Sequence, residues 1–332
     1  MNRANRILAV ILVVQIVLAA AVFILPRFTS ASAEGAPLLG ALTASDITGL
    51  TLRDSGSNAV QLVKQGDTWV VPDTDGFPAD KTKVEPFLEK VLGITTNPLV
   101  TRTSAGHKRL QVAEDDFARR VDLTLADGST RTLFLGAAST GGGYVRLNGQ
   151  DDVYVARGLY NYDVGVNIGL WIDATYFKVD QNQITRVTIE NANGTLEFEK
   201  DASGNWTMKG LAAGETFNAD HFTTILTRLS SISMVRPLGK VGKPEYGLDQ
   251  PTAVVTIAAG DKTYTLRIGA KDESGNTYVL SWMDSPYIVR VSSFTVGDFI
   301  DRGRDAYLSP TPTPTAAPAA SPTPETSPTP TP

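Results

Sequence analysis

The sequence contains no cysteine and only two histidines, His107 and His221. The lack of cysteine excludes disulfides, thiolate metal ligands, a cysteine nucleophile and the lipidated cysteine of a bacterial lipoprotein. A histidine that acts as a base needs a partner nucleophile, and no Gly-x-Ser-x-Gly element supplies a serine. The sequence therefore predicts no catalytic, cofactor-binding or metal-ligating residue, and we expect a protein that is not an enzyme.

Positive charge is scarce outside the amino terminus. The formal net charge is −5, from 30 basic and 35 acidic residues. Residues 1–27 contain three arginines and no acid, so the remainder has 27 basic and 35 acidic residues, a net charge of −8. A mildly acidic body without a basic stripe argues against nucleic acid as a partner.

One long apolar run is present, because residues 7–25 contain no charged residue. As a helix this run would rise about 28 Å, close to the hydrocarbon thickness of a bilayer of about 30 Å. Two arginines precede the run, which places residues 1–6 in the cytoplasm and the bulk of the chain outside it. We expect a single-pass transmembrane helix in the cell membrane, with the lipid bilayer as a partner. The alternative is a signal peptide cleaved after Ala33, since Ala31-Ser32-Ala33 has the form of a cleavage site.

The carboxyl end has no residues with which to build a core. From Ser309 it reads SPTPTPTAAPAASPTPETSPTPTP, and the prolines exclude helices and sheet ladders. We expect residues 307–332 to form a disordered, extended tail. The tail is either a spacer through a cell envelope or an end that binds nothing.

Between these two ends the sequence spells one unit twice. Each copy opens on a short Ile-Thr run, continues with two alternating strand-like segments and a tryptophan, and then has a phenylalanine followed by Ala-Asp. The corresponding residues are Asp46-Ile47-Thr48 and Gln183-Ile184-Thr185, Trp69 and Trp206, and Phe77-Pro78-Ala79-Asp80 and Phe217-Asn218-Ala219-Asp220. The pattern predicts a tandem duplication, and equivalent positions for both tryptophans favour core packing over sugar stacking.

A helix with an apolar stripe follows in each copy. Asp80 and Asp220 are the predicted N-caps, and His221 is expected in an exposed first turn. Pro86 predicts a kink or a late start in the first helix. The stripes are Val84, Phe87, Leu88, Val91 and Leu92 in the first copy, and Phe222, Ile225, Leu226, Leu229 and Ile232 in the second.

Four more strand-like runs close each copy. The sequence therefore predicts an α+β protein of two tandem homologous domains, each a mainly antiparallel sheet with one main helix, preceded by one transmembrane helix. Residues 171–181 are expected to cross from one copy to the next and to pack through Trp171 and Phe177. The predicted organisation is a cytoplasmic end at 1–6, a transmembrane helix at 7–25, a stub at 26–41, a first repeat domain at 42–172, a second at 173–306, and a tail at 307–332.

The second copy contains Tyr246-Gly247-Leu248-Asp249-Gln250-Pro251, then a strand, a turn and Leu266-Arg267-Ile268-Gly269. With the tryptophan, the Ala-Asp pair and a Tyr-Val strand, these residues resemble a bacterial family known as domain of unknown function 4340. The resemblance covers residues 42–305 and is partial in the first copy, where the corresponding run is LQVAEDDFARRV at 110–121. It implies a single-pass envelope protein, often encoded beside components of gliding-type ABC transporters, and it supplies no catalytic residues.

Three other stretches have a structural and a functional interpretation. Residues 72–80 carry Asp73, Asp75 and Asp80 around Gly76, which is typical of a turn and helix cap and only in part of a calcium loop. The glycine-rich residues 136–145 lack the ending of a phosphate loop and indicate a long hairpin turn. The acidic runs at 113–117 and 270–276 are either solvated turns or an acid/base pair.

We therefore expect an extracytoplasmic accessory or scaffold protein of a membrane complex, with an ABC transporter permease as the integral membrane partner that the resemblance implies. The first alternative is an envelope module that binds a glycan or lipid in a groove between the copies. The second is a hydrolase with an unrecognised catalytic set. A large apolar pocket between the halves would favour the binding module, clustered acids or His107 against a hydroxyl would favour the enzyme, and an exposed apolar patch would favour the scaffold.

Overall fold

A computed structural model describes Gln15, residues 35–56 and residues 58–310. The predicted cytoplasmic end, the transmembrane helix apart from Gln15, and most of the predicted tail lie outside these residues. Within the described part of the chain, no helix has both the length and the apolar character needed to cross a membrane.

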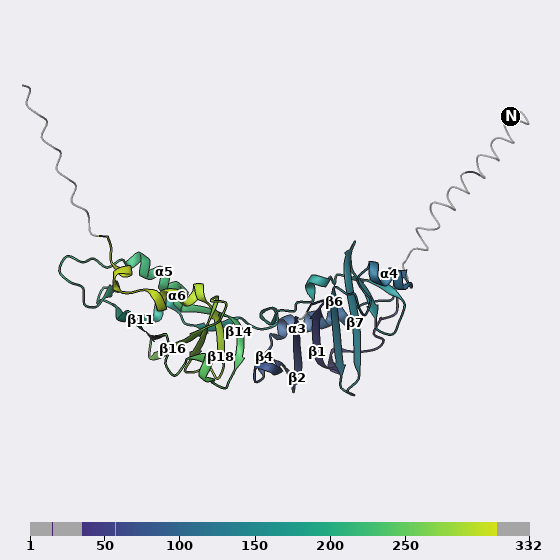
Figure 1. The fold of residues 1–332 in the computed structure, drawn as a ribbon, viewed down its shortest axis with the longest axis horizontal. Coiled ribbons are helices and arrows are strands. Elements are labelled where there is room, and N and C mark those ends of the chain that lie inside the picture. The colour runs from purple at the N-terminus through teal and green to yellow at the C-terminus, as the bar shows by residue number, and fades with distance from the viewer. Residues whose placement is uncertain (1–14, 16–34, 57, 311–332) are drawn as a thin grey trace, which may run out of the picture.

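The described residues form two nine-stranded antiparallel sheets with few helices, which confirms the predicted α+β class at this level. Figure 1 shows the sheets in two halves at opposite ends of the molecule. The first sheet has the order β4-β3-β2-β1-β6-β7-β8-β9-β5. Its strands are β1 Ile47–Asp54, β2 Ala59–Gln65, β3 Thr68–Val71, β4 Phe77–Pro78, β5 Leu99–Thr101, β6 Arg119–Leu125, β7 Thr130–Ser139, β8 Gly142–Leu147 and β9 Val153–Arg157.

The second sheet has the order β10-β14-β18-β17-β16-β15-β11-β12-β13. Its strands are β10 Thr175–Lys178, β11 Ile184–Asn191, β12 Gly194–Lys200, β13 Trp206–Met208, β14 Ser231–Gly239, β15 Ala253–Ala259, β16 Lys262–Lys271, β17 Thr277–Trp282 and β18 Ile288–Ser292. Read from its other edge, the second sheet matches the first over eight strands. The order β3-β2-β1-β6-β7-β8-β9-β5 in the first sheet corresponds to β13-β12-β11-β15-β16-β17-β18-β14 in the second. The ninth strand is added at opposite edges, as β4 in the first sheet and β10 in the second.

Irregularities in strand pairing also recur at corresponding places. The register between β1 and β6 shifts at Ile47/Gly49, and that between β11 and β15 shifts at Ile184/Arg186. A second pair of shifts interrupts the β7–β8 and β16–β17 ladders, at Leu135/Ala138 and Ile268/Lys271. A bulge re-aims the strand that contains it, so the two sheets share local bends as well as strand order.

The main helices are α3 Lys81–Leu92 and α5 Ala219–Ser230, and their predicted apolar stripes face the core. Asp80 caps α3 by accepting a hydrogen bond from the Thr82 amide at 2.9 Å. The predicted cap Asp220 is wrong, because Asn218 caps α5 by accepting from the His221 amide at 3.0 Å. In the structure Asp80 therefore corresponds to Asn218. The sequence pattern matches Asp80 with Asp220, which is two residues further along.

Pro86 does not delay the start of α3. The helix begins directly after its cap, and Pro86 lies exposed inside it. Proline removes one helix hydrogen bond, but the buried stripe holds the helix against the sheet. Ile232, predicted to end the second stripe, is buried but belongs to β14, which follows α5 without a break.

The core lies between the sheets and these helices, and it follows the alternation of the strands. β15 buries every second residue, from Ala253 to Ala259. Each large side chain buried in this way contributes about 1.5–3 kcal/mol. Trp69 is buried as predicted, with 4% of its surface exposed, whereas Trp206 is only half-buried and packs edge-on against Phe222. The expectation of core packing is therefore confirmed for Trp69 and only in part for Trp206, which packs against the core but keeps part of its surface exposed.

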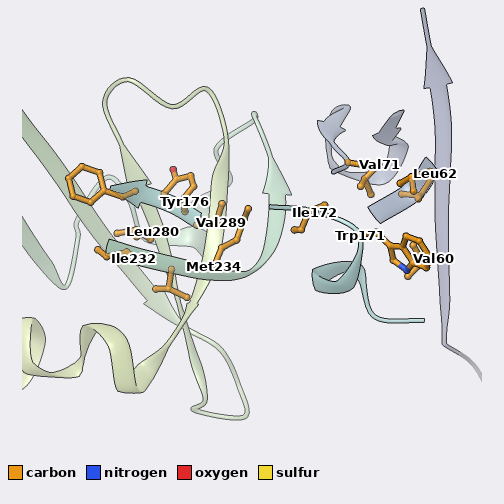
Figure 2. Packing of buried hydrophobic residues seen from close by; sticks show 14 of the residues in the cluster. Val60, Leu62, Val71, Trp171, Ile172, Tyr176, Ile232, Met234, Leu280 and Val289 are labelled. Carbon is orange, nitrogen blue, oxygen red and sulfur yellow. The ribbon is translucent and has the colours of Figure 1, made fainter. Parts of the chain in front are cut away.

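The connecting segment packs as predicted, with Trp171 and Phe177 both buried. Trp171 belongs to the same buried cluster as Val60 and Leu62 of the first half and Tyr176 and Val289 of the second (Figure 2). The packed body also extends beyond the domain ends expected from the sequence. Leu38 and Leu39 are buried at its start, within the predicted stub, and Tyr307 is fully buried at its end, within the predicted tail.

Sequence patterns missed the short strands β4, β5 and β10, the nine-residue strand β14, and the helices α4 Ser104–Arg109 and α6 Ser293–Asp301. The predicted long glycine-rich turn is also wrong. β7 continues to Ser139 and β8 begins at Gly142, so only Thr140 and Gly141 form the turn. Gly141 has a φ of 87°, which suits a tight hairpin.

Candidate functional site

The two halves meet in a contact between the segment before α3 and two parts of the second half, the end of β14 and the turn before β18. The Asp75 carboxylate accepts a hydrogen bond from the Lys240 backbone amide at 2.6 Å. The Tyr287 hydroxyl donates to the Gly76 carbonyl at 2.9 Å, and its ring lies edge-on to Phe77 with centroids 4.7 Å apart. These contacts fill this part of the junction, where the sequence suggested a ligand groove.

The connecting segment is also bonded to both halves. The Trp171 carbonyl accepts from the Asp80 amide at 2.7 Å, and the Ile172 carbonyl accepts from Lys83 Nζ at 2.6 Å. On the other side, the Met234 amide donates to the Ala174 carbonyl at 2.8 Å. The connection is therefore part of the packed structure on both sides of the junction.

Each half has a groove along its main helix, and the two grooves use corresponding residues. The α3 groove encloses about 280 Å³ and is lined on the helix by Lys83, Pro86, Phe87 and Lys90. The α5 groove encloses about 530 Å³ and is lined on the helix by His221, Thr224 and Arg228. Counted from the caps Asp80 and Asn218, Lys83, Pro86 and Lys90 occupy the same helix positions as His221, Thr224 and Arg228, whereas Phe87 has no counterpart in the α5 groove.

An acidic residue closes each groove on the opposite side. Asp163 lies six residues after the end of β9 and pairs with Lys90, with Nζ 3.4 Å from Oδ1. Asp298 lies six residues after the end of β18 and pairs with Arg228 at 2.5 Å. The two halves thus share an ion pair between the main helix and the segment after the last strand. Each pair is partly exposed, so its contribution to stability is small, about 0–1 kcal/mol.

The two grooves differ in the chemistry of their other residues. The α3 groove is the more apolar of the two. Lys83, Lys90 and Asp163 line part of it, but Tyr162 and Leu170 line the rest with 68% and 58% of their surfaces exposed, beside buried Trp171. Tyr162 is stacked on Tyr160 with ring centroids 4.9 Å apart, which fixes the plane of its ring. The groove can accept an apolar side chain from a partner, but no lining residue is a nucleophile paired with a base.

The α5 groove is more polar. Arg228 lies over the ring of Phe294, 4.7 Å from its centroid, and Arg302 is the second partner of Asp298 at 3.1 Å. His221 is half-buried, and its Nε2 has no hydrogen-bond partner within the described part of the chain. His221 is in the first turn, as the sequence predicted, but it is not fully exposed. Neither groove draws lining residues from both halves.

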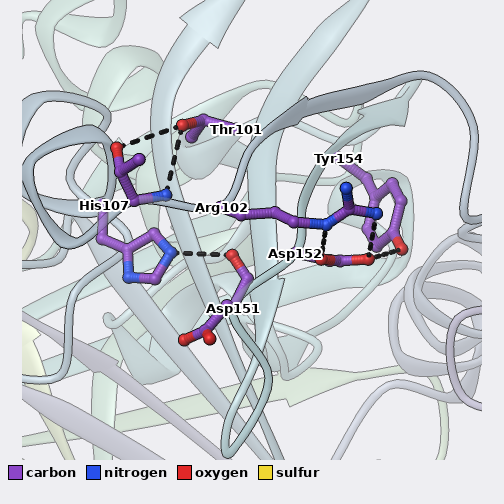
Figure 3. A network of polar contacts seen from close by, with 7 residues as sticks. Thr101, Arg102, His107, Asp151, Asp152 and Tyr154 are labelled. Atoms are coloured by element: carbon purple, nitrogen blue, oxygen red, sulfur yellow. Dashed lines mark hydrogen bonds and ion pairs between the residues drawn. The ribbon is translucent and has the colours of Figure 1, made fainter.

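A separate polar network joins β5, α4 and β9, as Figure 3 shows. Arg102 Nε is 2.6 Å from Asp152, which also accepts from the Tyr154 hydroxyl at 2.8 Å. The hydrogen bond from Arg102 lowers the pKa of Asp152, and burial, with a smaller effect of Asp152, raises the pKa of Tyr154. This arrangement holds the carboxylate ionised and ties β5 to β9.

His107 lies in the same network and is buried. Its Nε2 is 2.8 Å from the carbonyl oxygen of Asp151, so this nitrogen is the donor of the bond. The partner is a backbone carbonyl rather than a hydroxyl. His107 therefore fastens α4 to the loop before β9.

The other residues singled out in the sequence are dispersed. Asp75 bonds across the junction and Asp80 caps α3, so these acids do not surround one point. Among the described residues no group of three histidines and carboxylates could hold a metal ion. Asp115 pairs with Lys108 in the first half at 3.0 Å, whereas Asp272 bonds to its own turn in the second. The two acidic runs are therefore not brought together.

The α3 and α5 grooves could not be found from the sequence by a motif. The signal that was present is the basic residue at the same helical position in both copies, Lys90 and Arg228. This correspondence cannot be seen when the two copies are aligned by their Ala-Asp pairs. That alignment shifts one helix by two residues relative to the other, because the caps are Asp80 and Asn218.

Comparison with known proteins assigns a family. A family model described as Domain of unknown function (DUF4340) matches residues 69–245, more than half of the 332 residues. The match runs from β3 into the second sheet and is shorter than the 42–305 expected from resemblance; the Tyr246–Pro251 run lies just beyond it. No curated protein and no solved structure matches the chain. The chain belongs to the DUF4340 family of domains of unknown function.

Proposed function

We propose that the protein is an accessory or scaffold component of a membrane complex, held outside the cytoplasm by residues 7–25. The observation that carries this proposal is the α3 groove. Tyr162 and Leu170 are large apolar side chains that remain more than half exposed around one shallow cavity. Exposed apolar side chains gathered at one place are typical of a surface that another protein covers.

The position of the α3 groove supports a role in assembly. The groove is bordered by Trp171, which belongs to the connecting segment that holds both halves. A partner bound there would contact both the first half and the connecting segment, which fixes the position of the second half. This arrangement suits a scaffold, because occupancy of one groove stabilises the placement of two domains.

The second element of the proposal is the origin of the two halves by tandem duplication. Eight strands in the same order, matching register shifts and matching helix ion pairs support it. Duplication would give one chain two related grooves that have diverged, one more apolar and one more polar. Two such surfaces allow a scaffold to contact two components of a complex.

The third element is the class of partner. An integral membrane protein is the partner that a membrane-anchored body meets most often, since tethering raises the effective concentration to roughly millimolar. Among such partners, the family resemblance implies the permease of an ABC transporter.

Photo-crosslinking in living cells tests the proposal. A photoreactive amino acid replaces Leu170 or Tyr162 in the full-length protein, and Met283, which is 76% exposed in the second half, serves as the matched control. We expect positions 162 and 170 to yield adducts with an integral membrane protein and position 283 to yield none. Equal adducts from all three positions, or adducts with soluble proteins alone, would refute the scaffold role of the α3 groove.

A surface substitution gives a second readout. Leu170→Asp places a charge in the apolar groove and should reduce co-purification of the partner in mild detergent. Met283→Asp is the control for the added charge. Unchanged co-purification with Leu170→Asp, while the protein remains folded, would also contradict the proposal.

A further inference from the structure

The chain enters the packed body at one end of the first half, against the segment that leads into β5. The Thr96 amide donates to the Ala36 carbonyl at 2.9 Å, and Pro37 forms a β-bridge with Thr95. A Cβ on Gly35 would lie 2.8 Å from the Asn97 backbone nitrogen, so residues 35–37 lie directly on this segment. Helix α4, which follows β5, lies at the end of the molecule away from the second half (Figure 1).

An apolar surface lies at this same end. Leu99 and Val100 of β5 are 42% and 39% exposed, and Pro98 beside them is exposed. Ala36 and Pro37, which contact the same segment, are exposed as well. We call these five residues the β5 surface; none of them carries a charge.

The β5 surface lies on a free strand edge. Within the described part of the chain, β5 pairs only with β9 and ends the sheet. An apolar edge strand open to water invites pairing with another chain, and proteins usually protect such edges with charge, proline or a cover. Pro98 gives partial protection, but Leu99 and Val100 remain 42% and 39% exposed to solvent within the described part of the chain. Something outside the described body is therefore expected to shield this edge.

The segment between the predicted membrane helix and the packed body, which we call the tether, indicates by its length what covers this edge. Residues 26–34 separate the predicted membrane helix from Gly35, and nine residues span at most about 30 Å even when fully extended. The β5 surface begins at the point where this tether ends. The tether therefore keeps the β5 surface within about 30 Å of the bilayer, a limit that it does not set for the second half at the other end of the molecule (Figure 1).

The charges beside the β5 surface are compatible with a lipid interface. Arg102 is paired with Asp152 at 2.6 Å, and Lys108 is paired with Asp115 at 3.0 Å. Paired cations carry little net field toward the membrane, so contact would depend on the apolar residues and not on anionic lipid.

We propose that the β5 surface rests on the outer face of the lipid bilayer, with Leu99 and Val100 in the interfacial layer. This inference rests on the membrane anchor of the proposed function. In this orientation the first half contacts the membrane and the second half projects away from it. The α3 groove then lies between the membrane surface and the second half. That orientation gives the scaffold one face for lipid and leaves the groove open to a protein.

Fluorescence quenching in vesicles tests the orientation. The native chain has no cysteine, so a single environment-sensitive label can be placed by Val100→Cys in the full-length protein. Met283→Cys, exposed in the second half, is the matched control. The labelled proteins are reconstituted in phosphatidylcholine vesicles in which some lipids carry a nitroxide on the headgroup. We expect the label at residue 100 to lose most of its fluorescence and the label at residue 283 to keep it, with or without added phosphatidylglycerol.

The test distinguishes this inference from the anchor on which it rests. Retention of both labelled proteins in carbonate-washed vesicles reports the anchor. Retention combined with equal fluorescence at residues 100 and 283 would overturn the orientation and leave the anchor intact. Release of the proteins from the vesicles would overturn both. Quenching at residue 100 that disappears with Leu99→Asp would add support, since that change charges the edge without touching the anchor.

Discussion

The carbonyl oxygen of Tyr246 lies 2.0 Å from the point where Gly269 would carry a Cβ. In the first half, the carbonyl oxygen of Leu110 lies 1.8 Å from the corresponding point on Gly136. Both glycines lie at the register shifts of the central hairpins, β7–β8 and β16–β17. The two halves therefore use the same close approach of a loop to a bulged strand, although the loops share almost no sequence.

We expect Gly136→Ala and Gly269→Ala to be strongly destabilising, because a backbone carbonyl cannot move away without breaking the loop. The loss should be about 3 kcal/mol in the free energy of unfolding, at the upper end of what overpacking costs. Urea denaturation monitored by tryptophan fluorescence measures it.

The control for the glycines is Gly297→Ala in α6. A Cβ there would have only an Asp301 oxygen near it, at 4.0 Å. Alanine favours a helix over glycine, so this change should stabilise by about 0.5–1 kcal/mol. Equal changes in stability at all three positions would show that the close approach of a carbonyl is not the reason why Gly136 and Gly269 must be glycine.

The residue after each of these carbonyls adopts the left-handed conformation. Gly247 has a φ of 63° and Gln111 a φ of 56°. Glycine accepts this conformation readily, whereas an L-residue loses roughly 1–2 kcal/mol there. Gln111→Gly relieves that strain but gives the unfolded chain more freedom, which offsets part of the gain.

We expect Gln111→Gly to raise the free energy of unfolding by about 0.5–1 kcal/mol after this offset. The reciprocal change, Gly247→Gln, should destabilise, since a Cβ there would lie 3.1 Å from the Ala270 nitrogen. Chemical denaturation of both variants in parallel provides the measurement. A stabilising Gly247→Gln would contradict the assignment of the two positions as equivalents.

Strand identity and the helix stripes were predictable because each depends on a local period. β11, β12, β15 and β16 follow from alternation, and α3 and α5 follow from apolar residues three and four apart. β14 was missed because it follows α5 directly, with Ser230 in the helix and Ser231 in the strand, so no turn residue marks the change.

The remaining features depend on contacts between distant residues. Asp75 was predicted to belong to a turn, but its bond to Lys240 spans 165 positions of the chain and has no local pattern. The same holds for the α3 groove, which joins Lys90 to Asp163 across 73 positions. The exposure of Trp206 was misjudged because equivalence in sequence does not fix how much of a side chain its neighbours cover.

The turn between β16 and β17 should make stability depend on pH. The Asp272 carboxylate accepts from the Thr277 and Asn276 amides at 3.0 and 2.9 Å, and from the Ser274 and Thr277 hydroxyls. The bond from the Thr277 amide contributes most to lowering its pKa from the ordinary value of 3.8. Because the pKa is lower in the folded protein, the stabilisation is present above pH 3.8 and is lost as the pH falls through the folded value.

We expect Asp272→Asn to be less stable than the parent at neutral pH and to lose less stability on acidification. Urea midpoints measured from neutral pH down to about pH 3 compare the two curves. Other aspartates also contribute to acid sensitivity, so the difference between parent and variant is the quantity of interest. Parallel curves would mean that the turn does not depend on an ionised carboxylate.

The last prediction concerns the junction between the halves. Asp75 has a φ of 54°, and its Oδ2 would lie 2.5 Å from a Cβ on Gly239. The carboxylate therefore occupies the space left by a glycine in order to reach the Lys240 amide. Asn tolerates the left-handed conformation and keeps an oxygen acceptor, whereas Ala provides neither.

We expect Asp75→Ala to loosen the junction and Asp75→Asn to leave it nearly intact. One lost hydrogen bond costs about 0.5–1.5 kcal/mol, which is small against the stability of either half but large for the relative placement of two domains. Tyr287→Phe, which removes the bond to the Gly76 carbonyl and keeps the ring on Phe77, should add to the effect. Asp73→Ala changes an exposed neighbouring acid and is the control.

Distances between spin labels report the junction directly. The labels are attached to cysteines at Asp67 and Asp261, which lie exposed on hairpin turns of the first and second sheets. The distance distribution should broaden in Asp75→Ala, broaden further with Tyr287→Phe, and remain narrow in Asp75→Asn and Asp73→Ala. If the distribution stays narrow in the double variant, the connecting segment alone, through Trp171 and Ile172, holds the halves in place. A broad distribution already in the parent protein would mean that the Asp75–Lys240 bond forms only part of the time, and the scaffold would then acquire its fixed shape only when a partner occupies the α3 groove.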